Sequence, residues 1–303
     1  MSLSTFEELL CILGPYLVVD YYRSLSRSRG IPPLTPAAML QSTLSWLGGG
    51  SHHLTRVIAG ISTSTFYRVV YRVMFAVNDV DKLATRFPVS PEEAKRAAAG
   101  FQLRSNHGVI EHCIGVIDDW LCPIRDECGR VVSFFSGNYQ KYGLNVQACA
   151  DALSRFTAFS VNSPGGMNDA YAYQRWLLSN QLNKIDDPDF VIGDNAYVQC
   201  KRVLTPFNKT QLVDRPDRDS YNFHVSQLRI LVEMAFGLLN LEKTTSCAPA
   251  TLPYNYIGMY AFAQFLHYTT MRYFTDPSRS SFDVCNKEGT FMEQSRTINL
   301  RRV

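Results

Sequence analysis

Two short apolar runs in the middle of the chain each end in an aspartate. Residues 113–117 (Cys-Ile-Gly-Val-Ile) precede Asp118, and residues 190–193 (Phe-Val-Ile-Gly) precede Asp194. Short apolar runs of this kind are typical of buried strands. In an open α/β sheet, ligands bind at the carboxyl ends of neighbouring strands. The pattern therefore predicts an α/β fold with two carboxylates at one edge of a sheet, although either aspartate alone is equally suited to bonding backbone donors in a turn.

A third carboxylate lies on a long apolar helical pattern between residues 224 and 242. The polar residues of this helix fall three, four and seven positions apart, on one narrow stripe: Ser226, Arg229, Glu233 and Asn240. Glu233 is the acid of this stripe, and a buried carboxylate is costly unless it is paired or binds a metal. The alternative is an ion pair with Arg229, four residues earlier, and the two roles can coexist.

Together these three acids form a donor set that suits two Mg²⁺ or Mn²⁺ ions. Mg²⁺ prefers oxygen ligands and keeps bound waters that can react. Two such ions activate a water or a 3′-hydroxyl and stabilise the leaving oxygen of a phosphodiester displacement. Asp118 lies 76 residues before Asp194, which lies 39 residues before Glu233. The longer first interval leaves room for three strands and a helix between the first acid and the second.

Secondary-structure signals divide the chain into a helical region and an α/β region. Proline at a helix start, glycine at helix ends and three-and-four apolar spacing predict helices over 36–46, 52–59, 62–77 and 90–100. Beyond residue 108 we predict strands over 113–117, 131–135, 144–150, 156–161 and 190–193, and helices over 170–182, 224–241 and 254–273. The expected parts are a helical region over 1–108, an α/β domain over 109–275 and a polar tail over 276–303.

Composition excludes several other classes of protein. The chain has 30 Lys and Arg against 27 Asp and Glu, and a net charge of +3 is too weak to indicate a nucleic-acid partner by itself. No P-loop, nucleophile-elbow or dinucleotide motif occurs. The eight cysteines form no CxxC pair, which favours reduced thiols over a zinc site. The sequence shows neither a secretory signal nor an apolar run that spans a bilayer, so we expect a soluble protein with no membrane partner.

Six short motifs, taken in order, resemble the PIF/Harbinger-type transposases and their domesticated nuclease relatives, the DDE superfamily endonucleases. They are Gly115-Val-Ile-Asp118, Phe135-Ser-Gly137 with Leu144-Asn-Val-Gln-Ala148, Pro164-Gly-Gly-Met-Asn-Asp169, Gly193-Asp-Asn-Ala-Tyr197, Leu204-Thr-Pro206 and Val232-Glu-Met-Ala-Phe-Gly237. The resemblance implies a ribonuclease-H-like mixed sheet flanked by helices. It also implies that Asp118, Asp194 and Glu233 are the catalytic metal ligands. Asp169 matches a further family acid and is either an accessory ligand or the N-cap of a helix.

The same resemblance implies contacts with DNA outside the acids. In the all-helical N-terminal region it implies a helix-turn-helix-like unit over 36–77, against the alternative of a plain helical bundle. Candidate phosphate contacts in this unit are Arg56, Arg68 and Arg72. Candidate DNA-backbone contacts in the second region, against the alternative of solvated loops, are Lys141, Lys201, Arg202, Lys209 and Arg229.

Departures from the family pattern leave a second function open. The chain has Asp119-Trp120-Leu121 where the family often has Gly-Thr-His, and Met234 and Asn240 where it commonly has Arg and Lys. Fewer phosphate contacts weaken DNA affinity.

We therefore expect a metal-dependent DNA endonuclease with transposase-like phosphodiester cleavage, and the alternative is a domesticated, catalytically silent DNA- or protein-binding factor. A metal-independent hydrolase with two carboxylates, such as a glycosidase, is a weaker third option. The expected partners are DNA and a separate Myb-like DNA-binding protein, and a homo-oligomer is left open. The expected location is the nucleus, inferred from the DNA substrate, and otherwise the cytoplasm.

Overall fold

The computed structural model describes residues 2–27, 31–124 and 132–241, and these fall into two compact units. Unit 1 covers the described residues up to 84, and unit 2 covers those from 85 to 241. The helix expected over 254–273 and the polar tail expected over 276–303 lie outside the described residues.

Unit 1 is built of helices. They are α1 (Leu3–Leu17), α2 (Tyr21–Arg27), α3 (Pro36–Leu47), α4 (His52–Ile58) and α5 (Thr63–Asp79), followed by the 3-10 helix η1 (Asp81–Leu83). The hydroxyls of Thr35 and Ser62 accept backbone N–H groups at the starts of α3 and α5. The three helices predicted between residues 36 and 77 are therefore confirmed.

The three-and-four spacing of apolar residues in α5 determines the core of unit 1. Phe66, Val69, Val70, Val73 and Met74 are all buried along one face of this helix. Val69 and Val73 pack in a cluster with Leu9, Leu13 and Leu17 of α1 and Met39 and Leu40 of α3. Helix α5 is thus held by its apolar face, while Arg68 and Arg72 remain exposed on its other side.

Unit 2 contains a mixed sheet. Its strands are β1 (Cys113–Pro123), β2 (Phe135–Ser136), β3 (Lys141–Ala150), β4 (Phe156–Pro164), β5 (Phe190–Ile192) and β6 (Val203–Leu204). The described strands follow the order β2-β3-β1-β5-β6, and β4 also pairs with β3. β3 is antiparallel to β1, β2 and β4, whereas β5 runs parallel to both β1 and β6.

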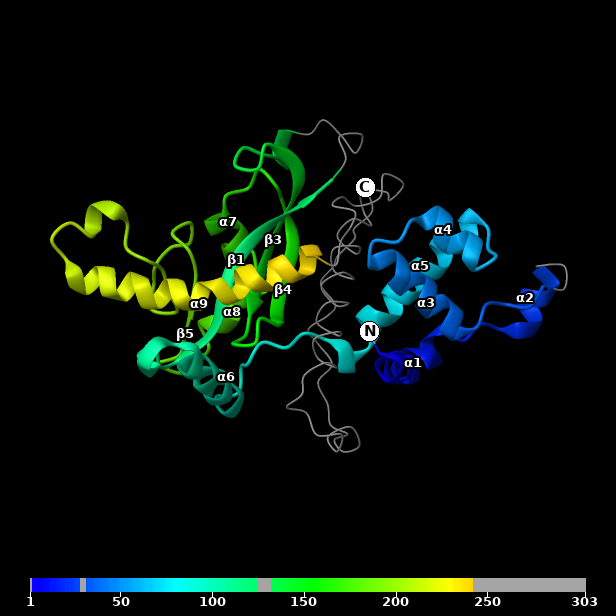
Figure 1. Ribbon diagram of the computed structural model, residues 1–303, viewed down its shortest axis with the longest axis horizontal. Helices are drawn as coiled ribbons and strands as arrows, with labels where there is room; N and C mark the ends of the chain where they lie inside the picture. The colour runs from blue at the N-terminus through cyan, green and yellow to red at the C-terminus, as the bar shows by residue number, and fades with distance from the viewer. Residues whose placement is uncertain (1, 28–30, 125–131, 242–303) are drawn as a thin grey trace. The chain divides into compact units, whose positions relative to one another are not determined.

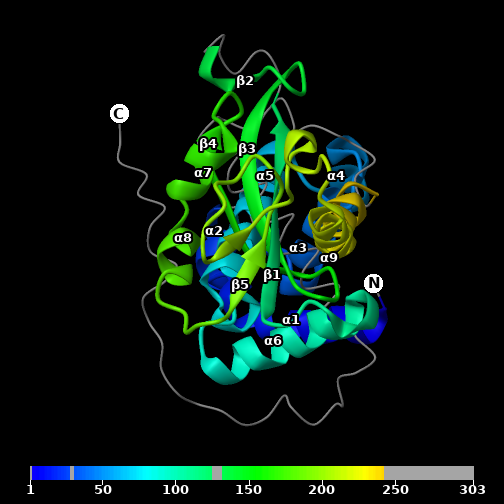
Figure 2. The same ribbon diagram turned by 90° about the vertical axis from the view of Figure 1, so that its left-hand side faces the viewer.

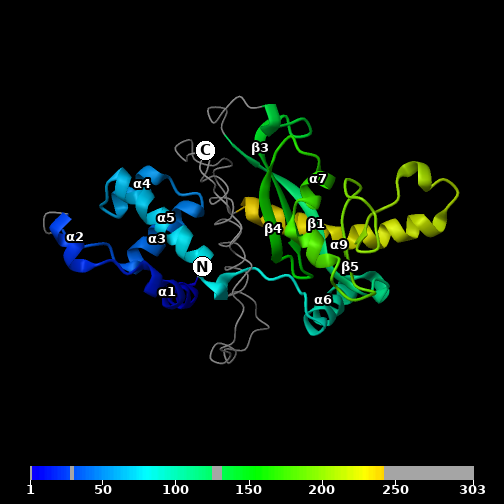
Figure 3. The ribbon, with the colours of Figure 1, turned by 180° about the vertical axis from the view of Figure 1, so that it is seen from behind.

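Helices cover both faces of this sheet. They are α6 (Pro91–Arg104), α7 (Asp169–Gln174), α8 (Leu177–Leu182) and α9 (Pro216–Leu241), with the 3-10 helices η2 (Asn106–Gly108), η4 (Val132–Phe134) and η5 (Lys209–Gln211). Helix α9 crosses in front of the strands in Figure 1 and behind them in Figure 3. In Figure 2 the sheet is seen with α9 on one side and α7 and α8 on the other. This is the α/β, ribonuclease-H-like architecture that the sequence predicts.

Alternation along β1 assigns each of its side chains to one of the two faces. Trp120 stacks on Phe236 of α9 at 6.2 Å between ring centroids. Ile117, an odd-numbered neighbour, packs instead in a cluster with Trp176 and Leu178 near α8. Because successive side chains of a strand point to opposite faces, Asp118 lies on the α9 face and Asp119 on the α7–α8 face.

Two of the predicted elements differ from the structure in type or continuity. The strand predicted over 131–135 is wrong within the described residues, because residues 132–134 form a 3-10 turn whose Ser133 carbonyl accepts the Gly166 N–H at 2.9 Å. The single helix predicted over 170–182 is broken at Trp176, which is extended and buried. Its indole belongs to the core cluster on this face, and anchoring it there interrupts the helix.

Three other elements differ in length or were not predicted. β1 does not end at Asp118 but continues to Pro123, because β3 pairs with it along that whole length. α9 begins at Pro216, inside the expected connection over 206–221, since proline at the helix start and acids in the first turn are good helix-initiating residues. The two-residue strand β6 was not predicted, because it is too short to show a period.

Helix α6 belongs to unit 2, although the sequence analysis drew the boundary near residue 108. Its capping box at Ser90 and Glu93 forms as predicted. Ala94 of this helix packs with Phe87 and Ile114 in the core cluster of the sheet. Helical periodicity alone does not show which unit a helix packs against, and burial of Ala94 decides it here.

Gly115 lies so close to the Cys149 side chain that a larger residue at this position would test how tightly the core is packed. A Cβ at Gly115 would lie 2.5 Å from the Cys149 sulfur on β3. We expect Gly115→Ala to lower the free energy of unfolding of unit 2 by about 1–3 kcal/mol, because the added Cβ overpacks a buried space in which the Cys149 side chain must give way. Thermal or urea denaturation followed by circular dichroism measures this change.

The matched control is Gly237→Ala in α9, where an added Cβ meets nothing within 4 Å. An exposed helical glycine replaced by alanine should raise stability by up to about 1 kcal/mol. Equal effects of the two substitutions would contradict the packing described at Gly115.

Candidate functional site

Parallel pairing of β1 with β5 brings Asp118 and Asp194 to one edge of the sheet. Val116 is the register partner of Ile192, and each aspartate follows its strand's paired residue by two positions. Beyond Ile192 the chain leaves β5, and the Gly193 N–H donates to the Leu204 carbonyl of β6 at 2.9 Å. The predicted adjacency of the two apolar runs is thus present, although Asp118 lies within its strand rather than at its end.

Asp118 is electrostatically linked to each of the other two predicted ligands. Its side chain is 14% exposed. Burial raises the pKa of Asp118 to about 6; Arg229 opposes this rise, whereas the charges of Asp194 and Glu233 add to it. The geometric link between α9 and this sheet edge is Arg229, which contacts both Asp118 and Glu233.

Glu233 is not buried, contrary to the expectation from its apolar helix. Its side chain is 53% exposed and its Oε1 accepts from Arg229 at 3.0 Å. Ile230 and Met234 are also half exposed, so apolar residues of α9 occur on its solvent side as well as on the face packed against the sheet. The ion pair left open by the sequence is present, and the same guanidinium lies 3.9 Å from Asp118.

The donor chemistry of this site fits a hard divalent cation. Asp118, Asp194 and Glu233 offer oxygen ligands, and a dication would offset the repulsion from Asp194 and Glu233 that adds to the burial-driven rise in the pKa of Asp118. Within residues 2–27, 31–124 and 132–241, no three His, Cys, Asp or Glu side chains are grouped closely enough to hold an ion. Glu233 would have to leave Arg229 to complete such a group, so the two-ion site stays a prediction.

A second polar cluster lies on the opposite face of β1. Gln147 of β3 pairs in register with Asp119 and accepts a hydrogen bond from the Tyr197 hydroxyl at 2.5 Å. Asn145, also on β3, donates to Asp169 at 2.7 Å and accepts from Gln147 at 2.7 Å. The cluster thus connects two strands, the start of α7 and the loop after β5.

Negative charge is concentrated around this second cluster. Burial raises the pKa of Asp119 to about 7, with further contributions from Asp169, Asp118 and Asp194. Burial also raises the pKa of Asp169, while its hydrogen bond from Asn145 opposes the rise. The pKa of Tyr197 is raised well above its usual value, first by burial and then by these aspartates.

Asp119 departs from the family pattern, and Asn145 and Gln147 were not among the predicted site residues. The signal for the last two was present, because amides at alternate positions of an apolar strand face one side and need partners there. The N-cap role considered for Asp169 belongs to its neighbour Asn168, whose side chain accepts the Ala170 N–H at 2.8 Å.

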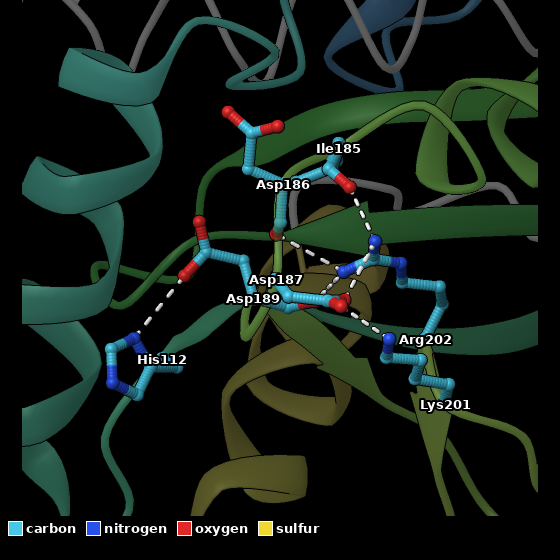
Figure 4. A network of polar contacts seen from close by, with 7 residues as sticks. All are labelled: His112, Ile185, Asp186, Asp187, Asp189, Lys201 and Arg202. Atoms are coloured by element: carbon cyan, nitrogen blue, oxygen red, sulfur yellow. Dashed lines mark hydrogen bonds and ion pairs between the residues drawn. The ribbon is translucent and has the colours of Figure 1, made fainter.

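Lys201 and Arg202 form contacts within the chain (Figure 4). Both cations pair with Asp187, and Arg202 is only 14% exposed. The Arg202 guanidinium also donates to backbone carbonyls of the loop that precedes β5, those of Ile185, Asp186 and Asp189. Where the loop joins β5, His112 Nδ1 lies 3.4 Å from Asp189 Oδ1. These contacts hold the loop that leads into β5, and a role for either cation toward DNA stays a prediction.

The remaining predicted DNA contacts are distributed over both units. Lys141 at the start of β3 and Lys209 in η5 are exposed, with no resolved ion pair for either among the described residues. In unit 1, Arg68 and Arg72 line a hollow of about 430 Å³ together with Tyr16, Tyr71 and Phe75. The Arg56 Nε is buried and has no hydrogen-bond partner among the described residues.

The raised pKa of Asp119 predicts how the free energy of unfolding of the metal-free protein changes with pH. Because the folded-state pKa of Asp119 is raised to about 7, its stabilising contribution is full at low pH and is lost as the pH rises from about 4 to 7. We expect Asp119→Asn to raise the free energy of unfolding at pH 8 by about 2 kcal/mol, half the full linkage value, because solvent reaches the group.

Thermal denaturation in EDTA, from pH 8 down to pH 4, checks this expectation. The advantage of Asp119→Asn should shrink steadily toward pH 4, where the wild-type carboxyl is already protonated in the folded chain. A variant that is less stable than wild type at pH 8 would show that burial and the neighbouring aspartates do not destabilise ionised Asp119.

In the described part of the chain, no helix is long and apolar enough to cross a membrane. No curated protein and no solved structure matches the chain. Residues 122–257, a little under half of the chain, match the family model described as DDE superfamily endonuclease. The matched segment contains Asp169, Asp194 and Glu233 and begins four residues after Asp118. Over this segment, which forms most of unit 2, the chain is similar to the DDE superfamily endonucleases.

Proposed function

We propose that unit 2 is a divalent-metal-dependent DNA endonuclease that cleaves phosphodiester bonds in the manner of a transposase. The observation that supports this most strongly is the electrostatic linkage of three acids from distant parts of the chain. Asp118 lies on β1, Asp194 follows the neighbouring strand β5 by two residues, and Arg229 connects Asp118 with Glu233. The family match supports a nuclease independently of this geometry.

Asp118, Asp194 and Glu233 would hold two Mg²⁺ or Mn²⁺ ions. Bound there, the ions would activate the attacking oxygen and stabilise the leaving one. The chain itself provides a site in which carboxylate charge is poorly solvated and closely spaced, so a cation is attracted strongly. Exposed Lys141 and Lys209 would bind the DNA backbone, and the helices of unit 1 would add phosphate contacts through Arg56, Arg68 and Arg72.

The same proposal includes three statements about the setting of the reaction. The substrate is DNA, the working location is the nucleus, and a separate Myb-like DNA-binding protein supplies targeting. A modest net charge of +3 is consistent with a nuclease that depends on another protein for part of its DNA affinity.

Substitution of Asp194 tests the nuclease directly. We expect Asp194→Asn to reduce nicking of supercoiled plasmid in Mg²⁺ or Mn²⁺ by more than about 100-fold, because even residues that only orient metal ligands contribute 10- to 100-fold. Agarose-gel conversion of supercoiled to open-circular DNA measures the rate.

Asp217→Asn is the matched control, since this exposed acid pairs with Arg215. It loses the same charge as Asp194→Asn and should cut like wild type. Wild-type cutting by Asp194→Asn would refute the assignment of this residue.

The second candidate is a catalytically silent DNA- or protein-binding factor. It is favoured by Glu233, which is half exposed and bound to Arg229 rather than grouped with the two aspartates. The two candidates differ in metal binding, which a silent factor does not need.

Calorimetric titration with Mn²⁺ in the absence of DNA separates these candidates. The nuclease predicts saturable binding to wild type, loss of at least about tenfold in affinity in Asp118→Asn, and no change in Asp217→Asn. Nicking without metal binding would support neither, and would instead favour a metal-independent hydrolase.

A further inference from the structure

One guanidinium links two of the three acids in the site. The Arg229 Nη2 atom lies 3.0 Å from Glu233 Oε1 and 3.9 Å from Asp118 Oδ2. Arg229 and Glu233 are one helical turn apart on α9, whereas Asp118 comes from β1, so the guanidinium connects the helix to the sheet edge. It also has the largest stabilising effect of any charge on ionised Asp118.

This guanidinium is only partly satisfied by its carboxylate partners. An arginine has five N–H donors, and the resolved hydrogen bond of the side chain is the one from NH2 to Glu233. The Arg229 Nε is buried and has no hydrogen-bond partner among the described residues. With the side chain only 22% exposed, water compensates little for the missing bonds.

A divalent cation at this site needs the oxygen atoms that now face Arg229. Asp118 Oδ2 and Glu233 Oε1 cannot coordinate a metal closely while a positive guanidinium lies between them, because like charges a few ångströms apart repel strongly in a poorly solvated site. Among the described residues no three metal-binding side chains are grouped, and Glu233 is paired with this guanidinium instead.

We propose that Arg229 is an internal counter-ion, which takes the place of a divalent cation between Asp118 and Glu233 and is displaced when the site binds metal. The proposal rests on the proposed metal-dependent function. In the metal-free chain Arg229 keeps the acids near one another by relieving their repulsion. Once displaced, it has lost its carboxylate partners and retains unused donors, which suit the phosphate oxygens that DNA brings.

A counter-ion role and a role in positioning Glu233 predict opposite changes in metal affinity when Arg229 is removed. If Arg229 only oriented Glu233 for the metal, removing it would weaken metal binding. If Arg229 competes with the metal, removing its charge strengthens metal binding, although the reaction on DNA still loses a phosphate contact. Metal affinity measured without DNA therefore distinguishes the two roles.

The experiment titrates the full-length chain with Mn²⁺ alone, by calorimetry and by loss of the free-Mn²⁺ electron paramagnetic resonance signal. We expect Arg229→Gln to bind Mn²⁺ about tenfold more tightly than wild type, because a unit charge beside the dication is removed. Arg229→Met, which keeps an apolar stem without the charge, should do the same if the glutamine variant does not fold.

Two controls accompany these variants. Arg229→Lys keeps the positive charge and should restore affinity to within about threefold of wild type. Arg215→Gln removes an equal charge from an exposed pair with Asp217 and should leave affinity unchanged. An equal gain in Arg215→Gln would overturn the proposal, because the effect would then come from net charge alone.

The remaining outcomes are also decisive. Unchanged or weaker Mn²⁺ binding in folded Arg229→Gln or Arg229→Met overturns the counter-ion role while leaving the nuclease proposal intact. Binding by the neutral variants but not by wild type supports the counter-ion role. If neither wild type nor any variant binds Mn²⁺, the proposed metal-dependent function is refuted, and the counter-ion role is refuted with it.

Discussion

The parallel hydrogen-bonded pairing of β1 with β5 is the constraint on which the site depends. Only a few residues pair, and the register of Val116 with Ile192 places two aspartates side by side although 75 residues separate them in the chain. The loop before β5 is held by Arg202, and the residue after β5 is held by its bond to Leu204. The short strand is therefore fixed at both ends, so the position of Asp194 does not depend on the length of β5.

β1 carries an aspartate on each of its faces, and the surroundings of the two carboxylates differ. Asp118 on the α9 face is balanced by Arg229, whereas Asp119 on the other face lies near Asp169 with no cation among the causes of its pKa shift. The amide groups of Asn145 and Gln147 donate to Asp169 and so compensate part of this concentration of acids. Such repulsion between carboxylates destabilises the fold at neutral pH.

Most of the fold could be predicted from sequence because its signals are local. Caps at Thr35, Ser62 and Ser90 and the apolar period of α5 locate helices without any tertiary information. The neighbouring position of the strands that lead to Asp118 and Asp194 could also be predicted, because aspartates after apolar runs suit one sheet edge. The elements that could not be predicted depend on long-range contacts: the break at Trp176, the turn over Val132–Phe134 and the two-residue β6.

Burial of individual side chains was the least predictable property of the site. An apolar helix suggests a buried Glu233, yet its neighbour Met234 is half exposed, so hydrophobic composition alone does not define the packed face of α9. Asp119 shows the converse, since a residue outside the family pattern is buried and is affected by the charges of Asp118, Asp169 and Asp194. In both cases, position relative to the sheet, rather than residue type, determines the electrostatic environment.

The boundary of the family match bears on how the site is assembled. The match begins at Cys122, inside β1, so the strand that carries Asp118 is shared between the matched segment and the residues before it. Because β1 pairs continuously with β3 from Val116 to Pro123, the two parts of the strand cannot be ordered separately. The hydrogen bonds between β1 and β3 consequently fix Asp118 together with the start of the matched segment. Arg229, which lies within that segment, contacts Asp118 at 3.9 Å. Asp118 thus belongs to unit 2 through hydrogen bonding and charge, although it precedes the residues that match the family model.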